Sequence, residues 1–167
     1  MTLSMYQASV PVFVRAMNNF AAILEKAVAH AEARRIDPSV LINSRLYPDM
    51  LPFFKQVQIA SDNAKGCAAR LAGVEPPKYE DNEKTFPELI ERLRKTVAYL
   101  NTLKAAQIDG SEERTITLKT HAGTLTMRGQ AYLLDRALPN FFFHITTGYC
   151  ILRHCGVEIG KDDYLGR

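Results

Sequence analysis

The sequence contains no tryptophan and has three cysteines among its 167 residues. Cys67, Cys150 and Cys155 are odd in number and lie within apolar helical patterns, so we expect reduced thiols in a reducing compartment. No run of about 18 apolar residues occurs, so no helix is predicted to span a membrane. The first ten residues lack the basic start and continuous apolar run of a signal peptide. These absences predict a cytoplasmic protein without a membrane partner.

Sequence motifs of several common chemistries are also missing. There is no P-loop, GxGxxG, GxSxG, CxxC or HExxH pattern, which excludes the mechanisms that require them. The net charge is +3, but a nucleic-acid-binding protein usually gathers its basic residues on one face. Here the basic residues are scattered among acidic ones, and we expect them to be solvated and to bind no nucleic acid; they include Arg34, Arg35, Arg45, Arg92, Arg94, Lys95 and Lys161.

Four segments carry apolar residues at helical spacing. With 47% hydrophobic and 23% charged residues, the chain has the composition of a globular protein, and its length suits one domain covering residues 1–167. Stripes that step by three and four residues indicate amphipathic helices. We therefore predict a mainly all-α protein, an antiparallel four-helix bundle. The stripes are Tyr6, Val10, Phe13, Met17, Phe20, Leu24 and Val28; Phe53, Val57, Ala60, Ala64, Cys67 and Leu71; Phe86, Ile90, Leu93, Val97 and Leu100; and Leu134, Leu138, Phe141, Ile145, Gly148, Leu152 and Cys155.

Capping signals and prolines suggest where the first helix begins. The spacing of Ser4 and Gln7 is that of a capping box. Pro11 then either kinks this helix or marks a restart with Ser9 as its cap. Asp37 and the proline after it are typical of the start of a short helical piece.

The later helices have their own boundary signals. Thr85 and Glu88 form a second capping box, and the helix that follows is predicted to end near Ala105. The fourth helix is predicted to begin near Gln130, to be kinked by Pro139 and to stop before a glycine, leaving a tail that we expect to be surface chain.

One segment changes its period from helical to alternating. Residues 115–119 and 124–127 are rich in β-branched side chains, and residues 120–123 join them, which favours a β-hairpin between the third and fourth helices. A lone two-stranded ribbon is marginal in water. We therefore expect the hairpin to lean on the bundle.

His144 is the leading candidate for chemistry. Asn140 and Thr147 lie four residues before it and three after it, so the three form a polar strip beside the apolar stripe of the fourth helix. An imidazole there can act as a base, bind a metal or hydrogen-bond a ligand. The alternative is a histidine at the edge of the core whose nitrogen is satisfied by a neighbour.

A second polar set belongs to the second long helix. Gln56 and Asn63 are seven residues apart and share one face. We place Asp49 in the first turn of this helix, where a carboxylate suits the positive end of the helix dipole and a capping role is the alternative. Antiparallel packing would bring this set opposite His144.

Four segments of the sequence are characteristic enough to compare with known families: residues 46–50 (LYPDM), 56–60 (QVQIA), 64–66 (AKG) and 137–166 (ALPNFFFHITTGYCILRHCGVEIGKDDYLG). They resemble a bacterial family of unknown function in the DinB/YfiT-like superfamily. The resemblance implies an up-down-down-up four-helix bundle that is commonly dimeric. It also implies, for members with a metal site, three histidine ligands that suit zinc or nickel, one from the second helix and two from an H-x-x-x-H pair on the fourth. Related members include thiol-dependent S-transferases.

This chain departs from that metal pattern. Gly148 stands four residues after His144, and residues 38–73 contain no histidine. A first-row metal site in a protein usually needs about three protein ligands. We therefore predict no metal of that geometry and no cofactor, with His144 hydrogen-bonded to Asp49, Gln56 or Thr147.

Two functions from different classes follow. The first is a small-molecule pocket between the second and fourth helices, lined by His144, Asp49, Gln56, Asn140 and Thr147. It would belong to a transferase-like or hydrolase-like enzyme with His144 as the catalytic base or a metal ligand. The second is a non-catalytic ligand-binding or interaction protein that works as a homodimer. The motives for a dimer are the resemblance and apolar residues beyond one stripe: Val12, Val14, Ile59, Tyr99, Phe142 and Phe143.

Overall fold

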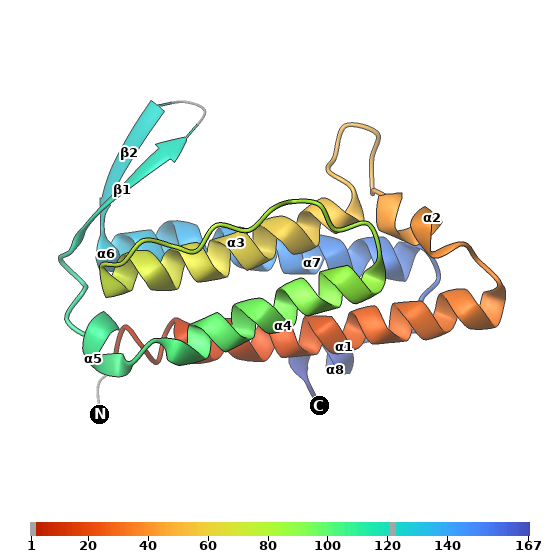
Figure 1. The fold of residues 1–167 in the computed structure, drawn as a ribbon, viewed down its shortest axis with the longest axis horizontal. Helices are drawn as coiled ribbons and strands as arrows, with labels where there is room; N and C mark the ends of the chain where they lie inside the picture. Colours follow the sequence, from red (N-terminus) through yellow and green to blue (C-terminus); the bar gives the residue numbers. More distant parts are fainter. Residues whose placement is uncertain (1–2, 121–122) are drawn as a thin grey trace.

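The computed structural model describes residues 3–120 and 123–167. Figure 1 shows the long helices lying side by side, with a hairpin and a loop projecting from one side of them. The predicted bundle and hairpin are confirmed. The long helices are α1 (Val10–Arg34), α3 (Phe53–Ala72), α4 (Phe86–Thr102) and α7 (Leu138–His154). The shorter elements are α2 (Pro38–Asn43), α5 (Ala105–Ile108), α6 (Gly129–Ala131), the π-helical segment η1 (Tyr132–Ala137), α8 (Lys161–Leu165), β1 (Thr115–Thr120) and β2 (Gly123–Arg128).

Contacts between the long helices give an up-down-down-up order. Gln56 and Asn63 of α3 face His144 and Asn140 of α7, respectively, so these two helices are antiparallel. Phe53 at the start of α3 packs on the start of α4, so α3 and α4 run parallel. Because parallel neighbours need a connection as long as the helix itself, residues 73–85 run back along α3 (Figure 1).

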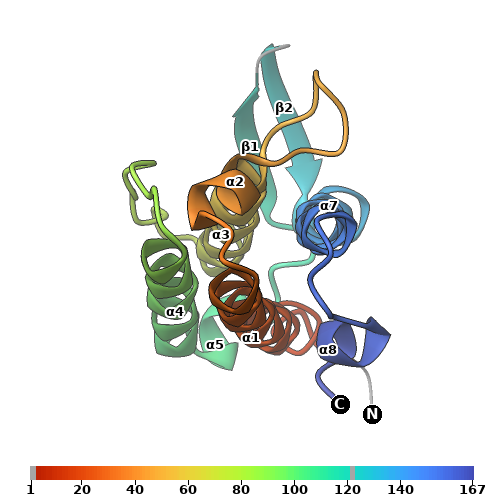
Figure 2. The ribbon, with the colours of Figure 1, turned by 90° about the vertical axis from the view of Figure 1, so that its right-hand side faces the viewer.

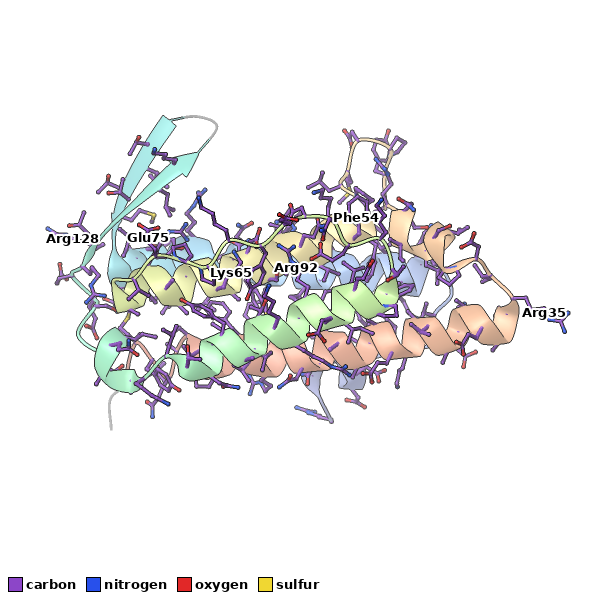
Figure 3. All side chains as sticks on the ribbon, in the orientation of Figure 1. Arg35, Phe54, Lys65, Glu75, Arg92 and Arg128 are labelled. Carbon is purple, nitrogen blue, oxygen red and sulfur yellow. The ribbon has the colours of Figure 1, made fainter. Side chains whose placement is uncertain are left out.

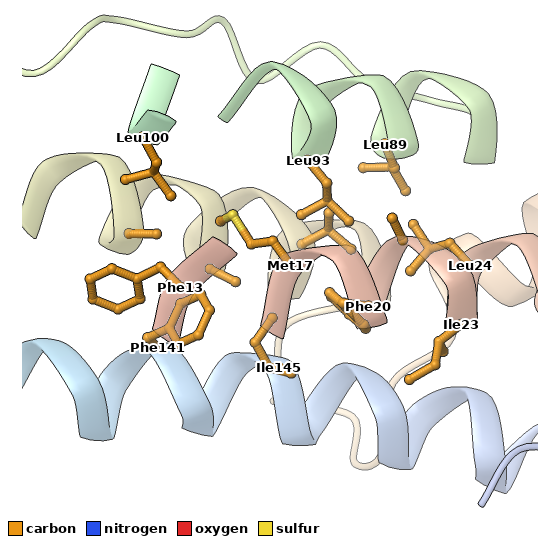
Figure 4. Packing of buried hydrophobic residues seen from close by; sticks show 14 of the residues in the cluster. Phe13, Met17, Phe20, Ile23, Leu24, Leu89, Leu93, Leu100, Phe141 and Ile145 are labelled. Carbon is orange, nitrogen blue, oxygen red and sulfur yellow. The ribbon is translucent and has the colours of Figure 1, made fainter. Parts of the chain in front are cut away.

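Aromatic rings join all four long helices at the core. Phe13 and Phe141 meet edge to face with ring centroids 4.9 Å apart. Phe20 lies 6.1 Å from Phe53, which in turn lies 5.7 Å from Phe86. Figure 4 shows the α1 side chains between those of α4 and α7. Such rings bury large apolar areas, so this cluster stabilises the packing of the four long helices.

The hairpin pairs β1 with β2 in antiparallel register. Ile116 lies opposite Met127 and Leu118 opposite Leu125. Ile116 is buried, while Leu118 and Met127 are partly buried against the core cluster, so the ribbon does lean on the bundle. The predicted turn at 120–123 includes residues 121 and 122, which lie outside the described residues.

The first helix starts later than its capping box indicates. Ser4 and Gln7 do exchange the two expected hydrogen bonds, each 3.3 Å long, but residues 5–9 form turns and α1 begins at Val10. Of the two alternatives, the restart is the correct one. Ser9 makes no capping bond, however, because its hydroxyl donates instead to the Met5 carbonyl at 2.6 Å.

Two boundaries near the end of the bundle differ from the predictions. The third long helix ends at Thr102, because Leu103 is extended and turns into the core before α5 begins. The tail after Gly156 is not surface chain. Val157 and Ile159 are buried, and α8 packs on α1, where Asn19 donates to the Tyr164 carbonyl at 3.1 Å.

The fourth helix begins near Gln130 and ends before Gly156, as predicted, but it is less regular than predicted. α6, η1 and α7 follow one another without a break, and the π-helical segment ends at Ala137, two residues before Pro139. A π turn adds one residue, so the side chains before it are rotated relative to a regular helix. Leu133 is therefore fully buried and Leu134 is 49% exposed, which contradicts the inward position predicted for Leu134.

In the ranges 3–120 and 123–167, every helix is too short or too polar to cross a membrane.

Candidate functional site

His144 stands at the centre of a hydrogen-bonded chain that joins α7, α3 and the loop before α3. His144 is only 8% exposed, and its Nδ1 lies 2.7 Å from Oε1 of Gln56. Gln56 Nε2 donates to the Leu51 carbonyl at 2.9 Å. Of the three partners predicted for His144, Gln56 is the one that the structure brings to it.

This chain of bonds determines which histidine nitrogen carries the proton. Because Gln56 uses its amide N–H on Leu51, the atom that it presents to His144 is a carbonyl oxygen, which can only accept. Nδ1 of His144 must therefore donate, and the other ring nitrogen, Nε2, keeps its lone pair when the ring is neutral. Burial lowers the pKa of His144 below its usual value, which favours that neutral form.

A second polar pair continues the line between α3 and α7. Asn140 donates from Nδ2 to Oδ1 of Asn63 at 2.8 Å, and Asn63 is itself held by the Ile59 carbonyl at 3.0 Å. Thr147 is buried one turn beyond His144 on α7. Gln56, Asn140, Asn63 and His144 thus share one seam, as their spacing predicted.

Asp49 does not belong to this seam. The structure places it on the exposed turn of the loop 44–52, four residues before α3 begins, and not in the first helical turn. The prolines on either side explain the difference, because Pro48 and Pro52 disfavour a helix through this stretch. Leu51, which the sequence did not single out, supplies a backbone carbonyl to the seam instead.

The metal site implied by the resemblance does not fit these residues. Within the described ranges, no three histidine, cysteine, aspartate or glutamate side chains gather in a way that could hold a metal ion. Gln56 occupies the α3 position that faces His144. At Gly148, an added Cβ would lie 2.6 Å from the Phe20 ring, so a histidine there would collide with the core.

A charged cluster that was not predicted from the sequence lies on the other side of α3. Arg92 of α4 was predicted to be solvated, but its side chain is 1% exposed. Its guanidinium contacts Asp62 at 2.8 Å, Asp81 at 3.0 Å and Glu83 at 2.9 Å. Ser61 accepts a further bond from Nε at 2.6 Å.

Arg92 and its partners fix the long connection between α3 and α4. The ring of Tyr79, which belongs to this connection, lies under three cations: Lys95 Nζ at 4.3 Å, Lys65 Nζ at 4.6 Å and the Arg92 guanidinium carbon at 5.5 Å. Figure 3 labels Arg92 and Lys65 beside the connection. Because the cations are paired with carboxylates or a ring, we assign this cluster a structural role. The cluster could not be predicted from a sequence pattern, because its members are spread over residues 61–95.

Comparison with known proteins gives the family. The family model described as "Domain of unknown function (DUF1993)" matches residues 5–165. A crystal structure of a DinB family member protein from Shewanella denitrificans is similar, with 41% sequence identity, a TM-score of 0.89, and coverage of 97% of this chain and 92% of that one. Among curated proteins no match was found. The chain therefore belongs to the DUF1993 family and is a DinB family member whose function is unknown.

Proposed function

We propose that this protein binds a small polar molecule at the seam between α3 and α7, with His144 as the group that acts on it. The observation that carries the proposal is the chain from His144 through Gln56 to the Leu51 carbonyl, with distances of 2.7 and 2.9 Å. It holds a neutral imidazole in one tautomer, with Nε2 as an acceptor. Orientation by a third group is typical of a histidine that works as a base.

The chemistry that suits this arrangement is proton abstraction from a hydroxyl, a thiol or a water molecule. A base must hold a free lone pair, and burial lowers the pKa of His144 and so favours the uncharged ring that supplies one. Gln56 would position the ring, while Asn140 and Thr147 would contact the ligand. Asp49 lies on the exposed loop 44–52, outside this seam. The reaction class is transferase-like or hydrolase-like, without a three-histidine metal.

The first test determines which ring nitrogen of His144 carries the proton. Nitrogen NMR of the His144 ring should show the proton on Nδ1 at neutral pH, and Gln56→Ala should allow both tautomers. His154→Gln is the matched control, because His154 is an exposed histidine in the last turn of the same helix. A ring protonated on Nε2 in the wild-type protein would refute the proposed acceptor.

The second test measures activity with simple probes. Hydrolysis of p-nitrophenyl acetate and thiol transfer to chlorodinitrobenzene represent the two reaction classes. His144→Gln should lower the rate of whichever of these reactions the protein catalyses by about 10²-fold or more, as expected for loss of a general base. His154→Gln should leave that rate unchanged. Equal rates in both variants would contradict a catalytic His144.

Metal content separates this proposal from metalloenzyme chemistry. Protein purified without an affinity tag should carry no stoichiometric zinc or nickel, and His144→Ala should leave its metal content unchanged. About one zinc or nickel per chain, lost in that variant, would instead show a metal centre at His144.

The second candidate, a non-catalytic dimer, has one observation in its favour. Apolar side chains around the loop 44–52 and His144 are unusually exposed: Tyr47 by 65%, Phe143 by 56%, Leu51 by 47% and Leu46 by 40%. Exposed apolar groups that lie together often mark an interface. Light scattering should then give twice the chain mass of 18.8 kDa, falling to the monomer in Phe143→Glu. A wild-type monomer at micromolar concentration would refute the dimer.

A further inference from the structure

A small cavity lies where the end of α3 meets the start of β1, away from His144. Its volume is about 250 Å³. Both sides contribute a cation, and the lining includes Arg70, Gly73 and Glu75 from the α3 side and Arg114, Thr115 and Thr117 from the β1 side. The cavity is shallow and widely open to solvent, with room for a single small group.

Arg70 and Arg114 are held in place but are not neutralised. Arg70 Nη1 donates to the Tyr132 hydroxyl at 3.3 Å, and Arg114 Nη1 donates to the Leu71 carbonyl. Within the described part of the chain, neither guanidinium forms an ion pair with a carboxylate. Each carries five N–H donors, so these contacts leave most of the donors unused.

Glycines make room for both guanidinium groups. A Cβ added to Gly66 would lie 2.5 Å from Arg70 Nη1, and one added to Gly73 would lie 3.0 Å from Arg114 Nη1. Gly73 also has a φ of +74°, a conformation that favours glycine. The Arg70 guanidinium therefore lies against Gly66 and the Arg114 guanidinium against Gly73, roughly 10 Å further along α3, and both residues line the cavity.

We propose that Arg70 and Arg114 form a binding site for an oxyanion, and specifically for the phosphate group of a small molecule. Guanidinium groups bind phosphate and carboxylate oxygens in a bidentate manner, and two of them together favour a doubly charged group. Glu75, an exposed carboxylate on the rim, opposes a bound anion. The site is separate from the seam, because Arg70 lies 14 residues after Gln56, roughly 21 Å along α3.

A purely structural role would make a different prediction. Cations near the C-terminal end of a helix interact favourably with its dipole, and the bond from Arg114 to the Leu71 carbonyl fits that role. Arg70 lies in the last turn of α3, so the same role also accounts for its charge. It does not account for the guanidinium donors that both residues leave without a partner among the described residues. Anion binding that depends on both residues distinguishes the two roles.

The test is an amide NMR titration of the full chain at constant ionic strength. The probes are inorganic phosphate, sulfate and acetate. Phosphate should shift amide signals at residues 70–75 and 114–117 and should saturate, sulfate should behave similarly, and acetate should bind more weakly. Saturation by acetate alone would mean a carboxylate site and would overturn the choice of phosphate.

Charge variants complete the test. Arg70→Gln should weaken phosphate binding by about tenfold or more, as loss of a charge-assisted hydrogen bond predicts, and Arg114→Gln should do the same. Arg35→Gln is the matched control, because it removes the same charge from an exposed side chain at the far end of α1 (Figure 3). Glu75→Gln should bind at least as tightly as the wild-type protein.

The test stays decisive if one variant fails to fold or if binding is non-specific. If Arg114→Gln unfolds because α3 loses its cap, the comparison of Arg70→Gln with Arg35→Gln still carries the test. Shifts that do not saturate, or an equal loss in Arg70→Gln and Arg35→Gln, would show only non-specific attraction and would overturn the proposal.

Discussion

At the scale of single residues, His144 shows how burial and one hydrogen bond select a protonation state. The imidazole is nearly buried, and its pKa is lowered by desolvation. Gln56 then directs the remaining proton to Nδ1. An amide in this position orients the ring without adding the negative charge that a carboxylate would bring, so the folded protein favours the neutral ring.

The lowered pKa of His144 predicts a pH dependence of stability. The unfolded chain binds a proton at His144 near its ordinary pKa of about 6.5, before the folded protein does. The contribution of His144 is therefore complete above that pH and is lost as the pH falls below it. Urea denaturation at pH 7.5, 6.5 and 5.5 should show a steeper fall in unfolding free energy for the wild type than for His144→Gln. If the unfolding free energies of the two proteins changed in parallel with pH, the lowered pKa of His144 would be contradicted.

Gly148 provides a second prediction at this scale. Alanine in a helix is favoured over glycine by about 1 kcal/mol, but a Cβ at this position would meet the buried Phe20 ring at 2.6 Å. Overpacking of a core typically costs about 1–3 kcal/mol, so Gly148→Ala should destabilise the protein in denaturant titrations. Gly160→Ala, where a Cβ meets nothing within 4 Å, should cost less than about 1 kcal/mol, because the only loss is that alanine is a poorer N-cap for the short helix α8. A stabilised Gly148→Ala would refute the packing argument.

At the scale of secondary structure, the π-helical segment η1 sets the register of the fourth helix. Pro139 follows it and lacks the backbone N–H that a regular helix would use, and its ring would clash with the carbonyl four residues earlier. A wider π turn relieves that conflict. The consequence is a rotation that turns Leu133 to the core and Leu134 to solvent.

The register of η1 is tested by two neighbouring leucines. Leu133→Ala should lower the unfolding free energy by about 2–5 kcal/mol, because it removes a fully buried side chain. Leu134→Ala should lower it by less than about 0.5 kcal/mol, since Leu134 is half exposed. The reverse order in urea titrations would support a regular α-helix through this segment.

At the scale of the whole molecule, the parallel pair α3 and α4 creates the main constraint on the chain. Residues 73–85 must return along the full length of α3, and this stretch has no secondary structure of its own. Figure 2 shows the four long helices end on, with the hairpin and the loop 44–52 rising from the side of α3 and α7. Arg92 and Tyr79 attach the return stretch to the bundle.

Loss of Arg92 should therefore affect the whole fold. Arg92→Gln would leave three carboxylates without their shared cation, and breaking a buried ion pair typically costs about 3–5 kcal/mol. Because Asp62 and Asp81 are over 40% exposed, we expect about 2–3 kcal/mol here. Arg94→Gln, which breaks the exposed pair with Glu25, should cost under 1 kcal/mol. Equal melting temperatures for the two variants would contradict the assigned role.

Local patterns in the sequence were sufficient to predict most of the helices. The capping box at Thr85 and Glu88 forms as predicted, and Asp37 caps α2 through Ser39 at 2.9 Å. The seam residues Gln56 and His144 were also found by spacing, because positions on one helix face are set by the helical repeat alone. Their roles in binding and catalysis stay predictions until the experiments above are done.

Only the tertiary structure decided the rest. The burial of Arg92, the anchoring of the tail and the exposure of Asp49 depend on contacts between segments far apart in the chain, which no local pattern encodes. The burial of Leu133 in place of Leu134 has the same origin, because the π turn determines which of the two leucines faces the core. By itself, the sequence determined the long helices, the hairpin and most of the faces that they bury. Long-range packing chose which polar groups met, because the cost of burying a charge depends on partners that only the fold supplies.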